Sequence, residues 1–206
     1  MLNSRRPLRL LLGVIAGLAV VPSAAHASLL AADATSCDSQ SLSQVFLPFA
    51  DVANYTLAPG GNAESADGLS LSGGASIVAG NEPFYVGSAS DSSSLRLPSG
   101  SSATTGTMCV GIDHPDMRFF AKSSGTNLFS GLRVDVNFQG ALGLQQLTIG
   151  TVLPSGSWTL SPVYLVVANL LPLLPNNMTP ASFTFTPQGA GTWSVDDIYV
   201  DPYSNR

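Results

Sequence analysis

Charged residues and the usual catalytic side chains are scarce in this chain. Only 10% of its 206 residues are Asp, Glu, Lys or Arg, and it has two histidines and two cysteines. A zinc site needs three or four His, Cys or carboxylate ligands, and the sequence has no H-E-x-x-H or C-x-x-C motif. It also has no G-x-S-x-G elbow, phosphate loop or dinucleotide fingerprint. This composition disfavours the common enzyme classes.

Catalysis by the remaining titratable groups is also poorly supported. A Ser-His-Asp arrangement would have to use His114, and Pro115 directly after it favours a turn or a strand start. The only glutamates are Glu64 and Glu82, and no two acidic residues have a known catalytic spacing. We therefore predict no catalytic residues and no enzymatic activity.

The first residues predict export. The chain begins with the basic segment "MLNSRRPLRL", continues with the apolar "LLGVIAGLAVV", and reaches "AHA", which ends at Ala27. This order is typical of a signal peptide, and the apolar run is shorter than the roughly 20 residues that span a bilayer. We predict a signal peptide over residues 1–27, cleaved near Ala27, and a secreted mature chain. Both the general and the twin-arginine export routes remain open.

The predicted mature chain, residues 28–206, has the size of one domain, with an irregular segment over 28–43. It carries five basic residues against thirteen acidic ones, a net charge of −8. Nucleic acids and anionic membrane surfaces call for basic patches, so we expect neither as a partner. The most apolar stretch, "VYLVVANLLPLLP", contains two prolines and is too short to span a bilayer. It predicts a buried strand that runs into an apolar loop, or alternatively a loop that seeks a membrane or a partner.

Two cysteines, Cys37 and Cys109, lie in the exported part of the chain. In an oxidising compartment they predict one disulfide. That bond would close a loop of about 73 residues, which stabilises the fold by roughly 4 kcal/mol in the chain-entropy model. Two free buried thiols are the alternative.

Short runs of alternating apolar and polar residues predict the fold class. In "GLRVDVNFQG" Leu132, Val134 and Val136 share one face, and "DGLSLSG", "SSLRLPSG" and "ASFTFTP" alternate in the same way. Strands with one apolar and one polar face belong to antiparallel sheets. Further predicted strands are "VFLPFAD", "ASIVAG", "PFYVGS", "TMCVGI", "MRFFAK", "LQQLTIGTV" and "WTLSPVYLVVA". We predict an all-β, two-sheet antiparallel β-sandwich of the jelly-roll type, with "SASDSSSL" and "PSGSSATTGT" as surface loops.

The last predicted strand, "GTWSVDDIYVDP", places two aspartates in an apolar run. If Ile198 and Val200 face the core, strict alternation puts Asp196 beside them, and Asp197 on the other face. A buried Asp196 needs an arginine, several hydrogen-bond donors or a cation. Calcium takes six to eight oxygen ligands, which this chain supplies in quantity. A structural calcium ion is one expectation, and a carboxylate held by donors or an arginine is the other.

The segments "GGNAESADGLSLSGGASIV" and "GTWSVDDIYVDP" resemble the first and last strands of jelly-roll carbohydrate-binding modules. The short motifs "FLPF", "LPSGS" and "YVDP" are also similar to motifs in uncharacterised secreted bacterial proteins. The first resemblance implies a structural calcium held by Glu64 and Asp196, with Asp197 as a further candidate. Ala63 and Leu69 stand where those modules have Phe and often Trp, which puts the ligand in doubt. No cofactor is required.

Sugar binding would need exposed aromatic faces. The candidates are Trp158, Trp193, Tyr199 and Tyr85, although a sandwich tryptophan is more often part of the core. We predict a secreted, non-catalytic, carbohydrate-binding-like module with a polysaccharide as partner. The alternatives are a structural or adhesive extracellular protein that binds protein partners, and a small glycan hydrolase or lyase.

Overall fold

The structure is a computed structural model, and it describes residues 40–111, 114–140, 143–166 and 178–203. The predicted signal peptide, Cys37, and most of the irregular segment 28–43 lie outside the described residues. So does most of the apolar stretch that ends at Pro175. In the described part of the chain, no helix has the length and hydropathy needed to span a membrane.

Short strands make up nearly all of the regular structure, as the alternating sequence pattern predicts. One 3-10 turn, η1 (Leu47–Phe49), precedes them. The strands are β1 (Thr56–Leu57), β2 (Leu69–Ser72), β3 (Ser76–Ala79), β4 (Ser93–Pro98), β5 (Ser102–Thr105), β6 (Met108–Val110), β7 (Asp116–Ser124), β8 (Gly131–Gly140), β9 (Gly143–Val152), β10 (Thr159–Leu160), β11 (Tyr164–Leu165), β12 (Thr179–Gln188) and β13 (Thr192–Asp201).

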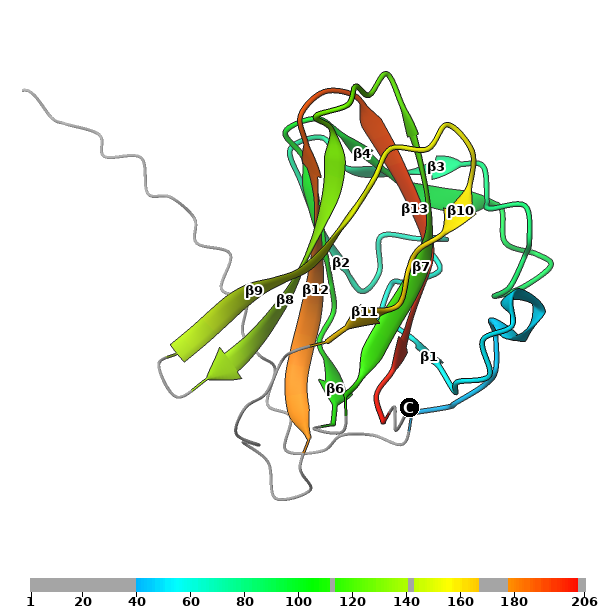
Figure 1. The fold of residues 1–206 in the computed structure, drawn as a ribbon, viewed down its shortest axis with the longest axis vertical. Helices are drawn as coiled ribbons and strands as arrows, with labels where there is room; N and C mark the ends of the chain where they lie inside the picture. Colours follow the sequence, from blue (N-terminus) through cyan, green and yellow to red (C-terminus); the bar gives the residue numbers. More distant parts are fainter. Residues whose placement is uncertain (1–39, 112–113, 141–142, 167–177, 204–206) are drawn as a thin grey trace, which may run out of the picture.

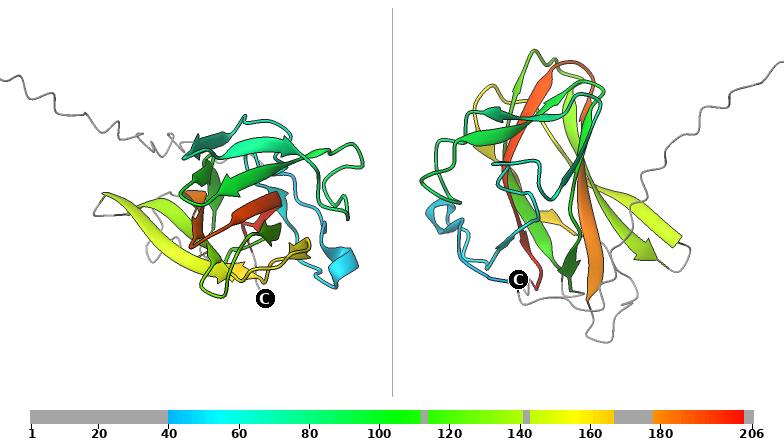
Figure 2. Two further views of the ribbon diagram at one scale, coloured as in Figure 1. Left: turned by 90° about the horizontal axis from the view of Figure 1, so that it is seen from above. Right: turned by 180° about the vertical axis from the view of Figure 1, so that it is seen from behind.

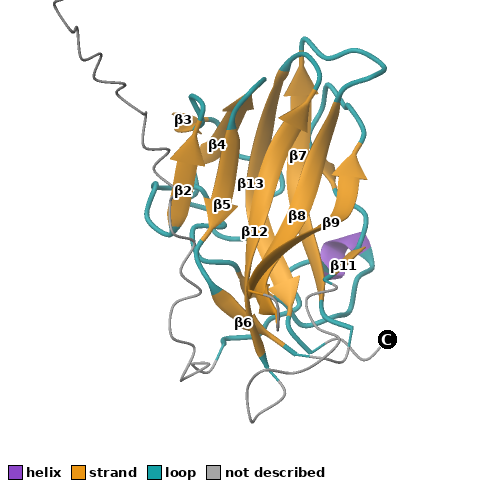
Figure 3. Ribbon diagram, turned by 90° about the vertical axis from the view of Figure 1, so that its left-hand side faces the viewer, coloured by secondary structure: helices purple, strands orange, loops and turns teal. Residues whose placement is uncertain are grey.

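The strands form two antiparallel sheets that face each other (Figures 1 and 2). One has the order β10-β7-β13-β4-β3, with β1 beside β13 and β11 beside β7, and is called the β13 sheet here. The other, the β12 sheet, has the order β2-β5-β12-β8-β9, with β6 beside β12, and faces the viewer in Figure 3. The prediction of a two-sheet antiparallel sandwich is confirmed.

The core lies between the sheets, where alternate residues of each strand meet. On β8 and β12, Val134 pairs with Phe185 and Val136 with Phe183, and all four side chains are buried. Full burial of each such side chain stabilises the fold by roughly 1.5–3 kcal/mol. The alternation in "GLRVDVNFQG" therefore identifies the buried face of β8 correctly.

The β12 sheet has a polar outer face. Asn137 Nδ2 donates to Thr184 Oγ1 at 2.8 Å, and Thr184 Oγ1 lies 2.8 Å from Thr104 Oγ1. Thr104 belongs to β5, which lies inside the "PSGSSATTGT" segment that the sequence indicated to be a surface loop. That prediction is wrong because β5 gains its stability from pairing with β2 and β12 rather than from apolar side chains of its own.

Two irregular segments, residues 42–55 and 80–92, pack over the outer face of the β13 sheet. Phe46 sits in a second apolar cluster with its ring 5.0 Å from that of Tyr55 and 5.7 Å from that of Tyr199. The stretches "VFLPFAD" and "PFYVGS" were predicted strands and form this cover instead. Each contains a proline, which lacks the N–H that a sheet ladder requires.

Candidate functional site

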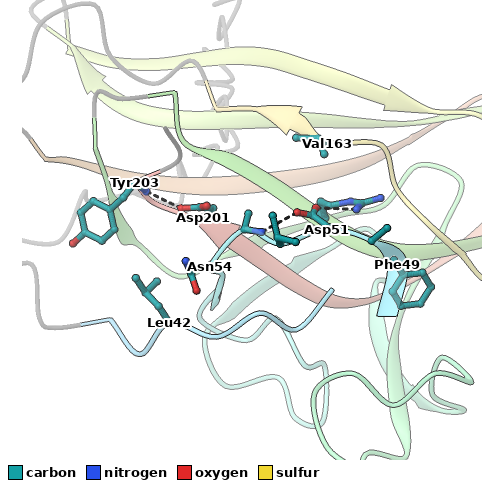
Figure 4. Close-up of a pocket in the computed structure, with 11 residues that line it drawn as sticks. Leu42, Phe49, Asp51, Asn54, Val163, Asp201 and Tyr203 are labelled. Atoms are coloured by element: carbon teal, nitrogen blue, oxygen red, sulfur yellow. Dashed lines mark hydrogen bonds and ion pairs between the residues drawn. The ribbon is translucent and has the colours of Figure 1, made fainter. Parts of the chain in front are cut away.

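A cavity of about 500 Å³ lies on the outer side of the β13 sheet, at the end where β13 finishes (Figure 4). It is lined by Leu42, Phe49, Ala50, Asp51, Val52, Ala53, Asn54, Arg118, Val163, Asp201 and Tyr203. These residues come from the 42–54 segment, β7, the connection before β11, β13 and the segment that follows β13. Only the tertiary fold brings them together, and none was a candidate from sequence.

The charged groups in this cavity are held in fixed orientations. Arg118 donates from Nη1 to Asp51 Oδ2 at 2.9 Å, and from Nε and Nη2 to the Ser161 carbonyl at 3.1 and 2.9 Å. Asp51 Oδ2 also accepts from the Tyr55 hydroxyl at 2.8 Å, and Asp51 Oδ1 accepts from Ala53 N at 3.1 Å. These hydrogen bonds leave the Arg118–Asp51 pair little freedom, so a ligand would meet preformed polar groups.

The rim of the cavity is more apolar and more open. Tyr203 is 49% exposed, Leu42 is 41% exposed and Val52 is 68% exposed. Tyr203 is placed by its backbone N–H, which donates to Asp201 Oδ1 at 3.0 Å. A polar floor with an aromatic and aliphatic rim suits a small ligand that has both hydroxyl groups and an apolar face.

A bulge in β13 sets the position of the aspartate pair. The pairing of β13 with β7 shifts between Asp196 and Tyr199, and Asp197 has a φ of 49°. Because of the extra residue, Val195 and Ile198 both face the core. Asp196 pairs with Phe120 and lies on the outer face, under the cover. The expectation that Asp196 shares the side of Ile198 and Val200 is therefore wrong.

Backbone donors compensate the charge of Asp196. Its Oδ2 accepts from Glu82 N at 3.0 Å, and its Oδ1 accepts from Asp197 N at 3.0 Å. Burial raises the pKa of Asp196 to about 7, although these two hydrogen bonds oppose the shift. The sequence left two expectations for Asp196, a calcium ion or a carboxylate held by donors or an arginine. The hydrogen bonds from the backbone fit the second.

Asp197 is the carboxylate left without compensation. It is 1% exposed, and neither of its oxygens has a hydrogen-bond partner in the described structure. Burial, followed by the charge of Asp196 and then by the side chain of Glu82, raises the pKa of Asp197 to about 8. A Cβ placed on Gly87 would lie 2.7 Å from Asp197 Oδ1 and 2.8 Å from Asp91 Oδ2. The oxygens of Asp91 and Asp197 thus flank one glycine.

Glu64, the other predicted metal ligand, is engaged elsewhere. Its Oε1 accepts from Ser92 N and Ser93 N, both at 2.8 Å. Over the described ranges, no group of three or more His, Cys, Asp or Glu side chains is arranged to hold a metal ion. The structure therefore does not assemble Glu64, Asp196 and Asp197 into a metal site. It places the buried Glu82 near the pair instead, a residue whose sequence context indicated only a turn.

The predicted ligand-binding aromatic residues are scattered. Trp193 is completely buried in the core and Tyr199 is 7% exposed in the second cluster, so neither presents a ring face to a ligand, and both are withdrawn as candidates. Trp158 is partly buried, with Lys122 Nζ 4.6 Å from its ring centroid. Tyr85 is 50% exposed but does not line the cavity.

Two further sequence candidates, His114 and Cys109, lie in the connection before β7 and on β6. His114 is exposed, with a φ of 58°, in the connection before β7. This conformation fits the turn that the following proline indicated. Cys109 is buried on β6, and no described cysteine is free. Because Cys37 lies outside the described residues, its pairing with Cys109 stays a prediction.

Comparison with known proteins finds no matching family model and no matching curated protein. Solved structures with a similar fold include the CBM22-1 and GH10 modules of endo-1,4-β-D-xylanase 10B from Clostridium thermocellum, complexed with xylohexaose. That match has a TM-score of 0.48 and 14% identity, over 69% of this chain and 28% of the other.

Two further matches are single domains. The CBM22-1 xylan-binding domain of Xyn10C from Paenibacillus barcinonensis has a TM-score of 0.43 and 10% identity, over 70% of this chain and 93% of the other. A CBM29-2 mutant complexed with mannohexaose has a TM-score of 0.45 and 13% identity, over 74% and 93%. The neighbours thus include carbohydrate-binding modules, and at these values the likeness concerns the sandwich fold alone.

Proposed function

We propose that this chain is a secreted, non-catalytic carbohydrate-binding protein that holds one sugar unit in the cavity beside Arg118. The observation that carries the proposal is the preformed set of polar groups under an aromatic rim. Each sugar hydroxyl donates one hydrogen bond and accepts two, so it needs donors and acceptors together. Arg118 supplies donors, Asp201 supplies acceptors, and Asn54 supplies both.

The size and lining of the cavity fit this ligand class. Small-molecule sites measure roughly 300–1,000 Å³, and this cavity measures about 500 Å³. The exposed Tyr203 ring can lie against the C–H face of a sugar, because an aromatic ring is an apolar platform with a polar edge. Binding without turnover is part of the proposal, since His114 is an exposed turn residue that does not line the cavity.

A glycan array, probed with the secreted protein in the presence of calcium, tests this function. The affinity for a glycan from that array is then measured for the wild type, Tyr203→Ala and Asn54→Ala. We expect each substitution to weaken binding about tenfold, which corresponds to about 1.4 kcal/mol. Tyr85→Ala is the matched control, because Tyr85 and Tyr203 are 50% and 49% exposed.

The outcomes separate the site from the function. Loss of binding in Tyr85→Ala but not in Tyr203→Ala would show that the glycan binds at the cover of the β13 sheet and not in the cavity. The carbohydrate-binding function would then stand, and only its proposed site would be wrong. An array without any bound glycan would reject the carbohydrate proposal and favour the structural or adhesive alternative.

We also propose that a hard cation, such as calcium, binds at Asp197. Support comes from the two unpartnered oxygens of this buried carboxylate and from Asp91 beside the same glycine. Carboxylate and carbonyl oxygens are the ligands that calcium prefers. Of the three metal ligands predicted from the sequence, only Asp197 would bind the cation directly. Asp196 and Glu64 would hold the nearby backbone in place through the hydrogen bonds that they accept from it. The cation would be structural, since it would join the 80–92 segment to β13.

A further inference from the structure

One end of the sandwich has no charged residue in its connections. Pro98 and Ser124 both pair with Thr192, so β4, β7 and β13 reach the same end. There the chain passes through the connections after β2, β4, β7 and β12, residues 73–75, 99–101, 125–130 and 189–191. None of them contains Asp, Glu, Lys or Arg. In Figure 1 this end is at the top, opposite the C-terminal label.

Three apolar side chains project from this end. Leu128 is 97% exposed, Phe129 is 91% exposed and Leu153 is 77% exposed, the highest values among the large apolar residues that the structure describes. Leu128 and Phe129 form the tip of the β7–β8 connection. Leu153 directly follows Val152, which pairs with Leu132 at the start of β8. The three side chains therefore belong to one edge of the uncharged end.

The tip has a defined conformation. Asn127 Oδ1 accepts from Phe129 N at 2.9 Å, and Ser130 Oγ donates to the Ala190 carbonyl at 2.8 Å. The Ala190 contact ties the tip to the β12–β13 turn. Leu128 and Phe129 are thus presented to solvent by an ordered turn, so docking would cost little additional backbone ordering.

Basic residues border the uncharged end. Arg96 and Lys122 both pair with Ser194, so they flank it on the outer face of the β13 sheet. Both lie two residues from the strand ends, about 7 Å along the strands. Trp158 lies under Lys122 and belongs to the connection after Leu153. Arg133, on the other sheet, is paired with Asp135 at 2.9 Å and adds no net charge.

The acidic side chains nearest this end are paired or buried. Asp135 is paired with Arg133, and the buried Asp196 lies two residues beyond Ser194 along β13. Asp51, Asp116 and Asp201 are at the opposite end of the β13 sheet. The ten residues of β13 separate the two ends by about 30 Å. That separation is about three Debye lengths at 0.1 M salt. Arg96 and Lys122 are therefore the charged side chains nearest to the apolar tip on the outer face of the β13 sheet, although the chain as a whole is acidic.

We infer that this end docks onto the surface of a phospholipid bilayer. Leu128, Phe129 and Leu153 would enter the boundary of the acyl region, where interfacial apolar groups sit about 5–10 Å deep. Arg96 and Lys122 would then lie at the level of the phosphates, and Trp158 at the interface that tryptophan favours. A second copy of the chain is a poorer occupant, because three side chains fall far short of the roughly 20–30 residues on each side of a stable protein interface.

Vesicle cosedimentation of the secreted protein tests this inference. We expect the wild type to bind phosphatidylcholine vesicles and to bind tighter, by about tenfold at low salt, when phosphatidylglycerol is added. Leu128→Ser combined with Phe129→Ser should lower the partition coefficient about a hundredfold on both kinds of vesicle. Arg96→Gln combined with Lys122→Gln should remove only the gain from phosphatidylglycerol.

The matched control is Leu165→Ser, since Leu165 is a 52% exposed leucine on β11, near the opposite end. It should bind like the wild type, and it and the Leu128→Ser/Phe129→Ser variant should keep the wild-type melting temperature because the substituted side chains are exposed. Wild-type protein that stays in the supernatant with both vesicles would overturn the inference. So would a Leu128→Ser/Phe129→Ser variant that binds as well as the wild type.

Discussion

Replacing Asp197 with asparagine should stabilise the metal-free protein at neutral and alkaline pH. In the folded state the pKa of Asp197 is about 8, raised from 3.8 chiefly by burial and then by the charges of Asp196 and Glu82. Between pH 3.8 and pH 8 the Asp197 carboxyl therefore holds a proton in the folded state and releases it in the unfolded state. A raised pKa of this kind contributes stability that is complete below pH 3.8 and is lost as the pH rises towards 8.

The magnitude follows from that interval. Between pH 3.8 and pH 7 the wild type loses about 1.4 kcal/mol of unfolding free energy per pH unit, or about 4 kcal/mol in all. Asparagine has nearly the same shape and no charge, so Asp197→Asn does not show this pH-dependent loss of unfolding free energy. The variant should therefore be up to about 4 kcal/mol more stable at pH 7, which is roughly 10 °C in melting temperature.

Thermal and urea unfolding in chelator, at pH 4, 5.5, 7 and 8.5, measure the effect. The two proteins should agree near pH 4 and diverge as the pH rises. Asp67→Asn is the control, since Asp67 is exposed and its substitution should change nothing at any of these pH values. A variant that is no more stable than the wild type at pH 8.5 would refute the argument from burial.

Added calcium gives the second arm of the experiment. A cation bound by ionised Asp197 stabilises only the wild type, by roughly 2.7 kcal/mol at a hundredfold excess over Kd. Its effect should grow with pH, because the proton and the cation compete for the same carboxylate. Equal wild-type melting temperatures in calcium and in chelator would reject the cation and leave the proton as the group that neutralises Asp197.

Three other predictions concern the remaining features. Intact mass and alkylation of unfolded, unreduced protein should show a Cys37–Cys109 disulfide, and two alkylated cysteines would contradict it. The purified protein should not hydrolyse polysaccharides or esters, and turnover that disappears in a folded His114→Ala variant would reverse that conclusion. Gly87→Ala should lower the unfolding free energy by roughly 1–3 kcal/mol, because its Cβ would lie 2.7 Å from Asp197 Oδ1. An unchanged melting temperature would show that the 80–92 segment shifts to relieve this contact at little cost.

The sequence alone determined the fold class and most of the strands. Alternation in a regular strand assigns each side chain to a face, so the apolar positions of β8, β12, β4 and β2 indicated both the strands and their buried sides. The scarcity of charge and of histidine removed most catalytic chemistries at the same stage. These features depend on neighbouring residues, which is why they could be predicted without a fold.

The tertiary structure decided the features that depend on distant partners. The bulge at Asp197 is a property of the pairing with β7, and it places Asp196 on the outer face instead of the core face that alternation assigned to it. Burial of the aspartate pair depends on the 80–92 segment, whose Glu82 lies 114 positions from Asp196. The cavity at Arg118 and the uncharged tip at Leu128 likewise join segments far apart in sequence. Exposure of a side chain is set by what packs over it, and local periodicity contains no information on that.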